Sequence, residues 1–552
     1  MNHDGVEPSM PVPLGVVVGG SLSRGLEVKL EGTRSLEGRE IEVGRYVAIQ
    51  GQESRFFALI TDVELKAANP TLAASPPPQG DDFFREVMQG TALYGGLKVR
   101  PYLRAGPLAS DPPRPAKTVP PHFAPVFEAS QEDIERVFGG EDRGFVIGNP
   151  LDMDAKVRLD YERFCERSNG IFGKSGTGKT FLTLLILSSL IQRSNAQGDP
   201  SRRVVNLIFD MHNDYGWQVK NERRGTQSKG LKQHFGNSVA VFTLDEESAR
   251  RRGVGIDSVV EVGYEDIEPE DIAVLRESLN LTPLAVEAVY ALEKYYRRPW
   301  LAQAQALEGD EEKEVRSRLN IDAATFANLR RGLDKLTRQP FLNAKARTTS
   351  MDLILGYLLQ GRNVVLEFGR YGDDVAAYVL VANLLTRRIR EAYRKRVESA
   401  LGDEARKPLH LIITIEEAHK FLNPQVANLT VFGIIAREMR KYNVTLLIID
   451  QRPSGIDEEV MSQIGTKVAF FLDNDKDVEA VLAGTGERGE LKGVLSRLES
   501  RRQALIFGHA LPMPIVVEVE EYGPDFYGRL AGGPGLRERL AADPADDLYP
   551  PR

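Results

Sequence analysis

The pattern of hydrophobic and polar residues changes along the chain, and its first part has the period of two that strands show. Between residues 12 and 68 short segments alternate apolar and polar residues and are separated by glycine, as in LEVKLEG, REIEVGRYVAIQG and RFFALITDVEL; GLKVRPYL adds another. Alternation of this kind is typical of strands with one buried face. Several short strands at this spacing predict a small N-terminal β-barrel over residues 1–105.

A proline-rich stretch follows, AGPLASDPPRPAKTVPPHFAPVF, from Ala105 to Phe127. Proline has no N–H group to donate to a neighbouring strand. We therefore expect an extended connector over residues 106–140.

From about Gly144, continuously apolar runs alternate with longer segments of helical periodicity. The runs are GIF (170–172), VVNLIF (204–209), NVVLEF (363–368), LIITI (411–415) and VTLLII (444–449). Strands that helices cover on both faces have this composition, so the pattern predicts a parallel α/β sheet. We expect this core in two parts, over residues 141–265 and 346–525.

Two further segments lie outside the strand pattern. Residues 266–345 carry amphipathic helical sequences such as EDIAVLRESLNLTPLAVEAVYALEKYYRR, and we interpret them as a helical insertion in the core. Residues 526–552 form a polar tail, GPGLRERLAADPADDLYPPR at its end. The sequence leaves open whether the tail is disordered or braces a neighbouring subunit.

Composition narrows the class of protein. The chain has 552 residues, which suggests two to four domains, and a formal net charge of -8. A general polycation is thus excluded, and nucleic-acid contacts would need a local basic patch. The single cysteine, Cys165, excludes a disulfide framework and a cysteine-rich zinc site. We find neither a signal peptide nor an apolar run of about 18–20 residues, so we expect a cytoplasmic protein without a membrane partner.

The segment GKSGTGKT fits the phosphate loop G-x-x-x-x-G-K-T between a strand and an apolar helix. Its glycines let backbone N–H groups point at phosphate oxygens, and the following helix adds its positive dipole end. Lys179 can bridge the β- and γ-phosphates, and the Thr180 hydroxyl can bind Mg²⁺. We therefore expect ATP and Mg²⁺ as cofactors. The predicted nucleotide-binding residues are Gly173, Lys174, Ser175, Gly176, Thr177, Gly178, Lys179, Thr180, Phe181 and Asp210.

Other predicted strands end in polar residues. VVNLIF is followed by Asp210, LIITI by Glu416 and Glu417, and VTLLII by Asp450 and Gln451. Ligands bind at the carboxyl ends of parallel strands, so these side chains should meet at the edge where the phosphate loop lies.

Each polar end has an expected role. Glu416 would hold Mg²⁺ together with Thr180, partly through water, and Glu417 would orient the attacking water and accept its proton. Gln451 would sense the γ-phosphate. The alternatives are an acidic pair where a strand meets solvent and an ordinary turn glutamine. Lone His419 is expected to be a polar group at a strand end.

Basic residues supply two further candidate sites. VFGIIAREMRKYN places Arg437, Arg440 and Lys441 on one side of a helix that can face a neighbouring subunit, where an arginine would stabilise charge on the γ-phosphate. A solvated basic face is the alternative. The segment KNERRGTQSKGLKQHFGNS (220–238) has five basic residues and one glutamate. We expect DNA phosphate contacts from Arg223, Arg224, Lys229 and Lys232, with a solvated basic loop as the alternative.

The motifs GKSGTGKT, DMHNDY, IEEAHKF, REMRKYNV and DQRPSGIDEEVMSQIGTKVAF, in this order, resemble the HerA DNA translocases of the HerA–FtsK group of P-loop ATPases. The resemblance covers roughly residues 12–70 and 140–520. It implies a RecA-like P-loop ATPase core with a parallel-rich sheet, a helical insertion and a small N-terminal β-barrel. It also implies a homo-hexameric ring with ATP between subunits, double-stranded DNA in the channel, and a NurA-like nuclease as partner in DNA-end processing and recombinational repair.

Residue by residue, the resemblance makes Arg440 the arginine expected to act in trans. A generic Walker B motif has aspartate where this chain has Glu416, so the division of labour between Glu416 and Glu417 stays open. Two other functions also stay open: a membrane-associated pump ATPase like the VirB4 group, and an ATP-bound ring scaffold that assembles a nuclease or a defence effector.

Overall fold

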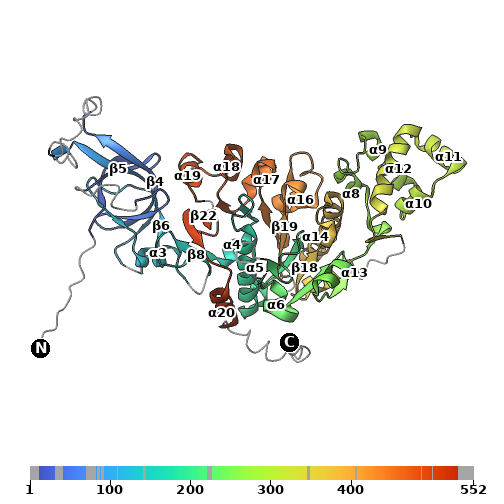
Figure 1. Cartoon of the computed structure of the whole chain (residues 1–552), viewed down its shortest axis with the longest axis horizontal. Helices are drawn as coiled ribbons and strands as arrows, with labels where there is room; N and C mark the ends of the chain where they lie inside the picture. Colours follow the sequence, from blue (N-terminus) through green and yellow to red (C-terminus); the bar gives the residue numbers. More distant parts are fainter. Residues whose placement is uncertain are drawn as a thin grey trace. The chain divides into compact units, whose positions relative to one another are not determined.

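The computed structural model describes residues 12–31, 41–69, 83, 87–88, 92–108, 110–140, 144–220, 227–344, 349–403, 407–486, 488–499 and 502–532. The chain divides into two compact units. The first comprises residues 1–161 with 466–520, and the second comprises residues 162–465 with 521–552 (Figure 1). The chain therefore passes from the first unit to the second, returns to the first at residue 466 and enters the second again at residue 521.

The first unit begins with an antiparallel barrel. Its strands, within the described residues, run in the order β2-β1-β7-β3-β4-β5-β6, and an additional pairing of β2 with β5 closes the ring. They are β1 (Gly15–Ser21), β2 (Gly25–Leu30), β3 (Tyr46–Gln50), β4 (Arg55–Ala67), β5 (Leu93–Ala105), β6 (Arg114–Pro115) and β7 (Pro125–Glu128). The predicted small N-terminal β-barrel is confirmed.

Alternation explains the barrel core. Val47 and Ile49 of β3, Phe56 of β4 and Val126 of β7 point inward and form one buried cluster. β6 and β7 fall within residues 106–140, the range expected to be a connector. β7 begins at the last proline of that stretch, Pro125, which pairs with Val16 of β1. Residues 126–128 pair with β3 and have N–H groups to donate.

The rest of the first unit is an antiparallel sheet whose strands come from distant parts of the sequence. Within the described residues its order is β21-β22-β23-β8-β9, with β21 (Thr466–Phe470), β22 (Gln503–Gly508), β23 (Ile515–Val519), β8 (Gly144–Pro150) and β9 (Val157–Asp160). Helices α3 (Gln131–Phe138), α18 (Asp475–Val481) and α19 (Arg488–Leu495) accompany it. Arg55 of the barrel binds Asp133 of α3 through two hydrogen bonds of 2.6 and 2.7 Å.

The second unit is built on a parallel sheet. Within the described residues its strands run in the order β15-β14-β18-β11-β19-β20-β10, and all of these pairs are parallel. They are β15 (Ser258–Val259), β14 (Val239–Thr243), β18 (Asn363–Glu367), β11 (Val204–Asp210), β19 (His410–Glu416), β20 (Val444–Asp450) and β10 (Asn169–Phe172).

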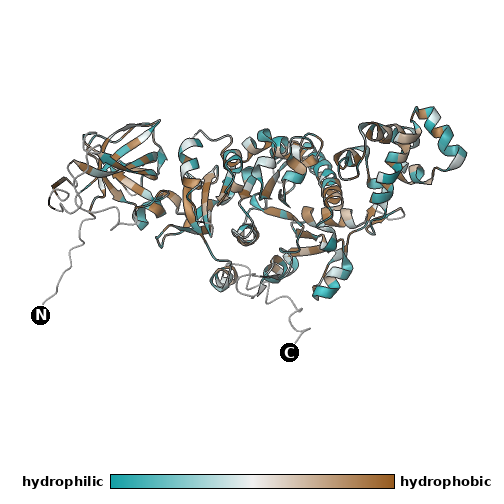
Figure 2. Cartoon of the chain, turned by 45° about the horizontal axis from the view of Figure 1, so that its top comes forward, coloured by the Kyte–Doolittle hydropathy of each residue, from teal (hydrophilic) through white to brown (hydrophobic). Residues whose placement is uncertain are grey.

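Every residue of β11, β14, β18 and β20 is buried. Successive side chains point to opposite faces, so both faces of this sheet are covered. Helices α5 (Lys179–Ala196), α13 (Thr349–Leu359), α14 (Val375–Ser399) and α16 (Val431–Glu438) belong to this cover. The predicted α/β P-loop core with a parallel-rich sheet is confirmed, and Figure 2 shows its strands in the brown of hydrophobic residues.

Shorter helices complete the second unit. They are α4 (Tyr161–Glu166), α6 (Leu231–Phe235), α7 (Glu246–Arg252), α15 (His419–Leu422), α17 (Glu458–Gln463) and α20 (Pro524–Gly532). Two small ribbons, β12 (Val219–Lys220) with β13 (Gln227–Ser228) and β16 (Val262–Gly263) with β17 (Leu342–Asn343), lie outside the main sheet. No helix among the described residues is long and apolar enough to span a membrane.

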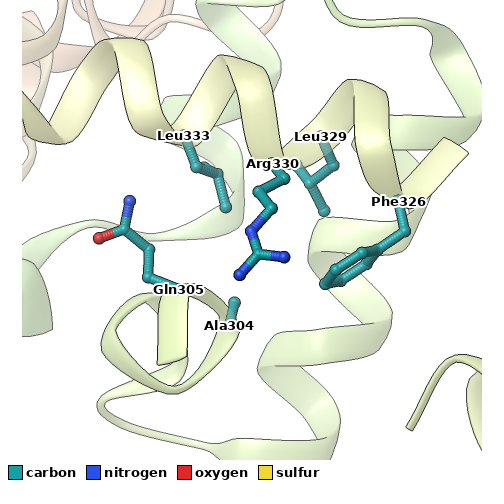
Figure 3. Close-up of a pocket in the computed structure, with 6 residues that line it drawn as sticks. All are labelled: Ala304, Gln305, Phe326, Leu329, Arg330 and Leu333. Carbon is teal, nitrogen blue, oxygen red and sulfur yellow. The ribbon is translucent and has the colours of Figure 1, made fainter. Parts of the chain in front are cut away.

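The range 266–345 contains the helices α8 (Pro269–Val274), α9 (Pro283–Tyr296), α10 (Trp300–Ala306), α11 (Gly309–Leu319) and α12 (Ala323–Thr337). Between α10 and α12 the Arg330 side chain fills a shallow pocket (Figure 3), lined also by Ala304, Gln305, Phe326, Leu329 and Leu333. The Arg330 guanidinium donates to the Leu307 carbonyl at 2.8 Å and lies 3.1 Å from Glu312. The pocket is therefore part of the packing of the helices.

We predict that Ile49→Ala opens the barrel selectively, because Ile49 is fully buried and truncation leaves a cavity. The cost should be about 2–5 kcal/mol, which accelerates amide exchange about 30-fold or more. Hydrogen exchange followed by mass spectrometry on peptides of β3, β4 and β7 measures this. Leu65→Ala, at a position that is 85% exposed on β4, is the control. Equal exchange in both variants contradicts the prediction.

Candidate nucleotide-binding site

Four neighbouring strands of the second unit each end in a buried carboxylate. These are Glu367 on β18, Asp210 on β11, Glu416 on β19 and Asp450 on β20, and none is more than 6% exposed. The strand register places Asp210 opposite Glu367 and Asp450 opposite Phe172, the last residue of β10. Because the strands are parallel, the structure brings Asp210, Glu416 and Asp450 to the edge from which the phosphate loop starts, as the sequence indicated.

The phosphate loop connects β10 to α5. Gly176 and Gly178 have φ angles of 75° and 112°, a region that favours glycine. The Lys179 ammonium donates to the carbonyls of Gly173 and Lys174, both at 2.7 Å. Burial lowers the pKa of Lys179 to about 8, against the opposing effect of Glu417, Asp450 and Glu416. The loop thus has a lysine at the N-terminus of a long helix, as binding of a phosphate group requires.

Asp210 anchors the loop that follows its own strand. Its carboxylate accepts the backbone N–H groups of Asp214 at 2.7 Å, Tyr215 at 2.8 Å and Gly216 at 3.3 Å. Burial, and next the nearby Glu367, raise the pKa of Asp210 well above its ordinary value. Asp210 therefore positions the segment DMHNDYG, and its direct contact with nucleotide stays a prediction.

The sequence interpretation missed Glu367 and its partner Arg252. The Glu367 side chain is fully buried and forms an ion pair with the guanidinium of Arg252, in the last turn of α7. Burial raises the pKa of Glu367, while Arg252 opposes the rise. The signal that could have identified Glu367 is the same as for the other three, since NVVLEF is an apolar strand that ends in a carboxylate.

Glu416 has one satisfied and one unsatisfied carboxylate oxygen. Oε1 accepts a hydrogen bond from the Tyr215 hydroxyl at 2.7 Å, whereas Oε2 is buried with no hydrogen-bond partner among the described residues. Burial raises the pKa of Glu416 to about 7. A divalent cation beside Oε2 would satisfy this oxygen and favour the ionised form. The residue therefore fits the Mg²⁺ ligand that the sequence suggested.

Glu417 follows with a different geometry. Its φ of 48° lies in the left-handed region, and its Oε1 accepts a hydrogen bond from Gln451 Nε2 at 2.8 Å. Its exposed fraction is larger than that of Glu416. The two predicted residues Glu417 and Gln451 are thus in direct contact beside the phosphate loop.

His419 joins the ends of β19 and β20. Its Nδ1 lies 3.0 Å from Asp450 Oδ2 and 3.5 Å from Glu417 Oε2, and its backbone N–H donates to Asp450 at 2.7 Å. The hydrogen bond to Asp450 raises the pKa of His419. Ligand atoms of Glu417, His419 and Asp450 lie within 4.8 Å of one another. His419 is thus a polar group at the start of α15, shortly after the end of β19, and its contact with Asp450 becomes an ion pair when the imidazole is protonated.

The candidate Arg440 does not lie beside the phosphate loop of its own chain. Arg440 is in the 3-10 turn η7 (Met439–Tyr442), its side chain is 59% exposed, and Nη2 lies 3.6 Å from Glu166. Arg440 and Glu166 precede β20 and β10, whereas the phosphate loop follows β10. Because β10 and β20 are parallel, Arg440 lies at the amino-terminal ends of the strands, whereas the phosphate loop lies at their carboxyl ends. Arg437 is 19% exposed and lies 3.9 Å from Glu459, and Lys441 lies over the ring of Tyr442 at 5.1 Å.

Two of the four predicted DNA-binding residues, Arg223 and Arg224, lie outside the described residues. The backbone of Lys229 is bound by two tyrosine hydroxyls, that of Tyr522 at 2.9 Å and that of Tyr527 at 3.3 Å. The Lys232 ammonium donates to the Val239 carbonyl at 2.8 Å and lies 3.3 Å from Asp257. Lys232 thus has partners within the fold, and DNA contact by this segment stays a prediction.

Comparison with known proteins supports the resemblance noted in the motifs. Residues 145–389 match the family model described as "Helicase HerA, central domain", and residues 14–83 match the HAS barrel domain. A curated protein of Sulfurisphaera tokodaii is 24% identical over 561 residues, which cover 95% of this chain and 96% of that protein. One of Pyrococcus furiosus is 22% identical over 423 residues, which cover 72% and 73%.

Both relatives are named "DNA double-strand break repair helicase HerA". Among solved structures, VirB4 of Thermoanaerobacter pseudethanolicus aligns over 70% of this chain and 99% of its own, with 15% identity and a TM-score of 0.43. The resemblance to HerA is confirmed by the domain matches and the curated relatives.

We predict that phosphate binding weakens as the pH rises through about 8, because the Lys179 ammonium, whose pKa is lowered to about 8, loses its proton. Above that pH the affinity should fall by about tenfold per pH unit. Calorimetric titration with inorganic tripolyphosphate between pH 7 and pH 9.5 measures the effect. Lys179→Ala is the control. It retains Glu416, which titrates near pH 7, and lacks the lysine that titrates near pH 8. The same steep fall in Lys179→Ala contradicts the assignment.

Proposed function

We propose that this chain, with its HerA central domain and HAS barrel, is an ATP-hydrolysing motor that moves double-stranded DNA through a homo-hexameric ring. The observation that carries the proposal is the contact between Glu417 and Gln451 beside the phosphate loop, on an edge lined by buried carboxylates. The names of the curated relatives support DNA as the substrate.

The phosphates of ATP would bind the loop from Gly173 to Thr180. Loop N–H groups and the start of α5 would hold the β-phosphate, and the Lys179 ammonium would move from the carbonyls of Gly173 and Lys174 to phosphate oxygens. Thr180 and Glu416 would hold Mg²⁺, with the unsatisfied Glu416 Oε2 available for it or for its water. When bound, Mg²⁺ neutralises charge on the β- and γ-phosphate oxygens.

Glu417 would act as the general base. It accepts a proton from the attacking water while the water oxygen bonds to the γ-phosphorus and the bond from that phosphorus to the β,γ-bridging oxygen breaks. Gln451 holds Oε1 of Glu417 at 2.8 Å and so orients the carboxylate. The inner position of Glu416 and the outer position of Glu417 favour cation binding for the first and proton transfer for the second.

The position of Arg440 supports the proposed ring. The transferred phosphoryl group develops charge that an arginine stabilises, and Arg440 lies at the far edge of the sheet from its own phosphate loop. Arg440 would therefore serve the site of the next subunit. A head-to-tail contact of this kind closes into a ring when the rotation permits.

DNA in the channel would meet the segment with Arg223, Arg224, Lys229 and Lys232 through phosphates, without sequence preference. A NurA-like nuclease as partner, and a role in DNA-end processing and recombinational repair, complete the proposal. They rest on the resemblance and on the names of the relatives. Displacement of a protein roadblock from linear duplex on ATP addition separates the motor from a scaffold, because a scaffold leaves the roadblock bound.

We predict that Glu417→Gln lowers the rate of ATP hydrolysis by about 100-fold or more, because a general base contributes this much. Nucleotide affinity should change little, since the lysine and the loop are intact. A phosphate-release assay with and without linear duplex gives the rate, and a fluorescent nucleotide gives the affinity. Glu458→Gln, at an exposed position of α17, is the matched control. Retained hydrolysis in Glu417→Gln would remove Glu417 as the base.

We predict that Arg440→Ala lowers hydrolysis and that the defect is complemented in mixed rings. Arg440→Ala has an intact phosphate loop, and Lys179→Ala has an intact Arg440. A mixture of the two should therefore hydrolyse ATP faster than the sum of the separate preparations. The measurement is the rate after the subunits have been denatured together and refolded, against each variant treated alone. Simple additivity contradicts a shared site.

A further inference from the structure

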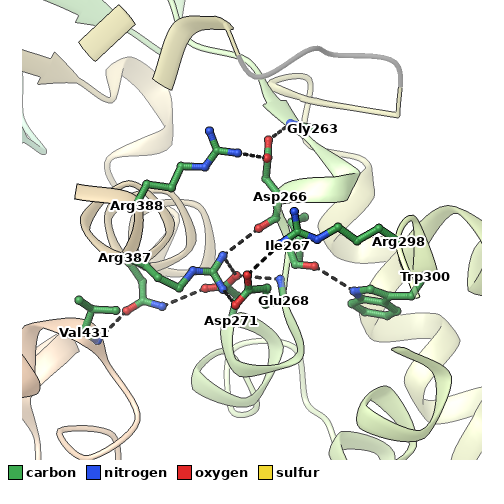
Figure 4. Close-up of polar contacts among 11 residues, drawn as sticks. Gly263, Asp266, Ile267, Glu268, Asp271, Arg298, Trp300, Arg387, Arg388 and Val431 are labelled. Atoms are coloured by element: carbon green, nitrogen blue, oxygen red, sulfur yellow. Dashed lines mark hydrogen bonds and ion pairs between the residues drawn. The ribbon is translucent and has the colours of Figure 1, made fainter. Parts of the chain in front are cut away.

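Helix α16, which leads into the turn with Arg440, begins at a buried contact with helix α14. The first N–H group of α16, on Val431 (labelled in Figure 4), donates to Asn383 Oδ1 at 3.0 Å. Asn383 lies in the first half of α14 and is 2% exposed. The first N–H groups of a helix have no partner within the helix, so this side chain satisfies one that would otherwise be buried without a bond.

The nitrogen of the Asn383 side-chain amide binds the helical insertion. Asn383 Nδ2 donates to Asp271 Oδ1 at 2.9 Å, and Asp271 lies in α8, at the start of the insertion. Asp271 Oδ2 accepts the backbone N–H of Glu268 at 2.9 Å and lies 3.0 Å from the Arg387 guanidinium. Arg387 also pairs with Glu268, and the neighbouring Arg388 pairs with Asp266.

These contacts fix the orientation of the Asn383 amide. A backbone N–H group can only donate and an ionised carboxylate can only accept, so the amide oxygen must face Val431 and the amide nitrogen must face Asp271. A buried network of this kind is rigid while every member is satisfied, and removal of one partner leaves a buried polar group unpaired. A shift of α8 that keeps these bonds must therefore carry the start of α16 with it.

We propose that Asn383 and Asp271 are positioning residues that couple the helical insertion to the arginines of α16 and η7. Helix α16 has 8 residues, and Arg437 and Arg440 lie in and directly after its last turn. The contact at Val431 sets where this short rigid element begins, and so where its arginines are presented. The inference rests on the proposed function, because the arginines are taken to act on a neighbouring subunit's site.

The variant that tests this is Asn383→Asp. In its ionised form the new carboxylate still accepts the Val431 N–H but has no donor for Asp271, so the link to the insertion is broken at alkaline pH while α16 keeps its own bond. We expect kcat for ATP hydrolysis to fall about tenfold or more, with KM and nucleotide affinity within about threefold of wild type, because the phosphate loop is untouched. Loss of nucleotide affinity with kcat unchanged would overturn the inference.

Two further variants separate positioning from general damage. Thr386→Val is the matched control on the same helix, because Thr386 is fully buried and its hydroxyl has no hydrogen-bond partner among the described residues. It should leave kcat unchanged. The double variant Asn383→Asp with Asp271→Asn exchanges donor and acceptor, so the new amide can donate to the new carboxylate. This exchange should recover part of the lost kcat. A double variant no better than the single one contradicts the inference, and Asp271→Asn alone replaces Asn383→Asp if that chain does not fold.

Mixed rings distinguish this inference from the proposed function. Asn383→Asp together with Lys179→Ala should exceed the sum of the separate rates, because Lys179→Ala presents a correctly placed α16 to the intact phosphate loop. If Arg440→Ala is complemented in this way and Asn383→Asp is not, Asn383 acts within its own subunit and the inference is wrong while the proposed function stands. If neither is complemented, the shared site itself fails.

Discussion

The second unit depends on four carboxylates that are buried side by side at the carboxyl edge of one parallel sheet. Burying ionised carboxylates without partners is prohibitive, so the surroundings must supply hydrogen bonds and opposite charge. Asp210 receives three backbone N–H groups, Glu367 receives Arg252, Glu416 receives the Tyr215 hydroxyl, and Asp450 receives His419. The loop at 214–216 and helix α7 supply hydrogen bonds and positive charge that stabilise these buried carboxylates.

At Glu416 the buried carboxylate is only partly stabilised by its surroundings. One oxygen of Glu416 is left without a hydrogen bond, and its pKa is raised to about 7 by burial. Burial also lowers the pKa of Lys179 in the phosphate loop, to about 8, against the opposing effect of Glu417, Asp450 and Glu416. Burial disfavours the charged form of both side chains. A bound cation would stabilise the ionised Glu416, and a bound phosphate would stabilise the charged Lys179. These observations support the proposed division of roles, with Glu416 on the cation and Glu417, held by Gln451, on the attacking water.

The sequence predicted those parts of the fold and the site that are encoded locally. The phosphate loop is contiguous, and Asp210, Glu416 and Asp450 each follow an apolar strand, so strand direction alone places them together. The pairs Arg252–Glu367 and Asn383–Asp271 could not be predicted, because they join residues 115 and 112 positions apart on elements whose packing no local pattern specifies. Lys232 shows the same limit, since a basic residue in a basic segment gave no sign of Asp257, 25 positions away. The sequence did not predict strands β6 and β7, because the many prolines of residues 106–140 favour an extended connector.

The same geometry that makes the site compact also leaves it chemically incomplete within one chain. In a parallel sheet the carboxyl ends of all strands lie on the same side. Residues that directly precede a strand, such as Arg440, therefore lie on the opposite side, at the amino-terminal ends. This position of Arg440 is the reason for our proposal that its positive charge serves the nucleotide site of another copy. Helix α16 then has to be held from outside the catalytic edge, and in this chain the described contact at its first residue comes from Asn383, which is itself held by the insertion. An insertion far from the phosphates in sequence can thus bear on hydrolysis in a neighbouring subunit without touching nucleotide.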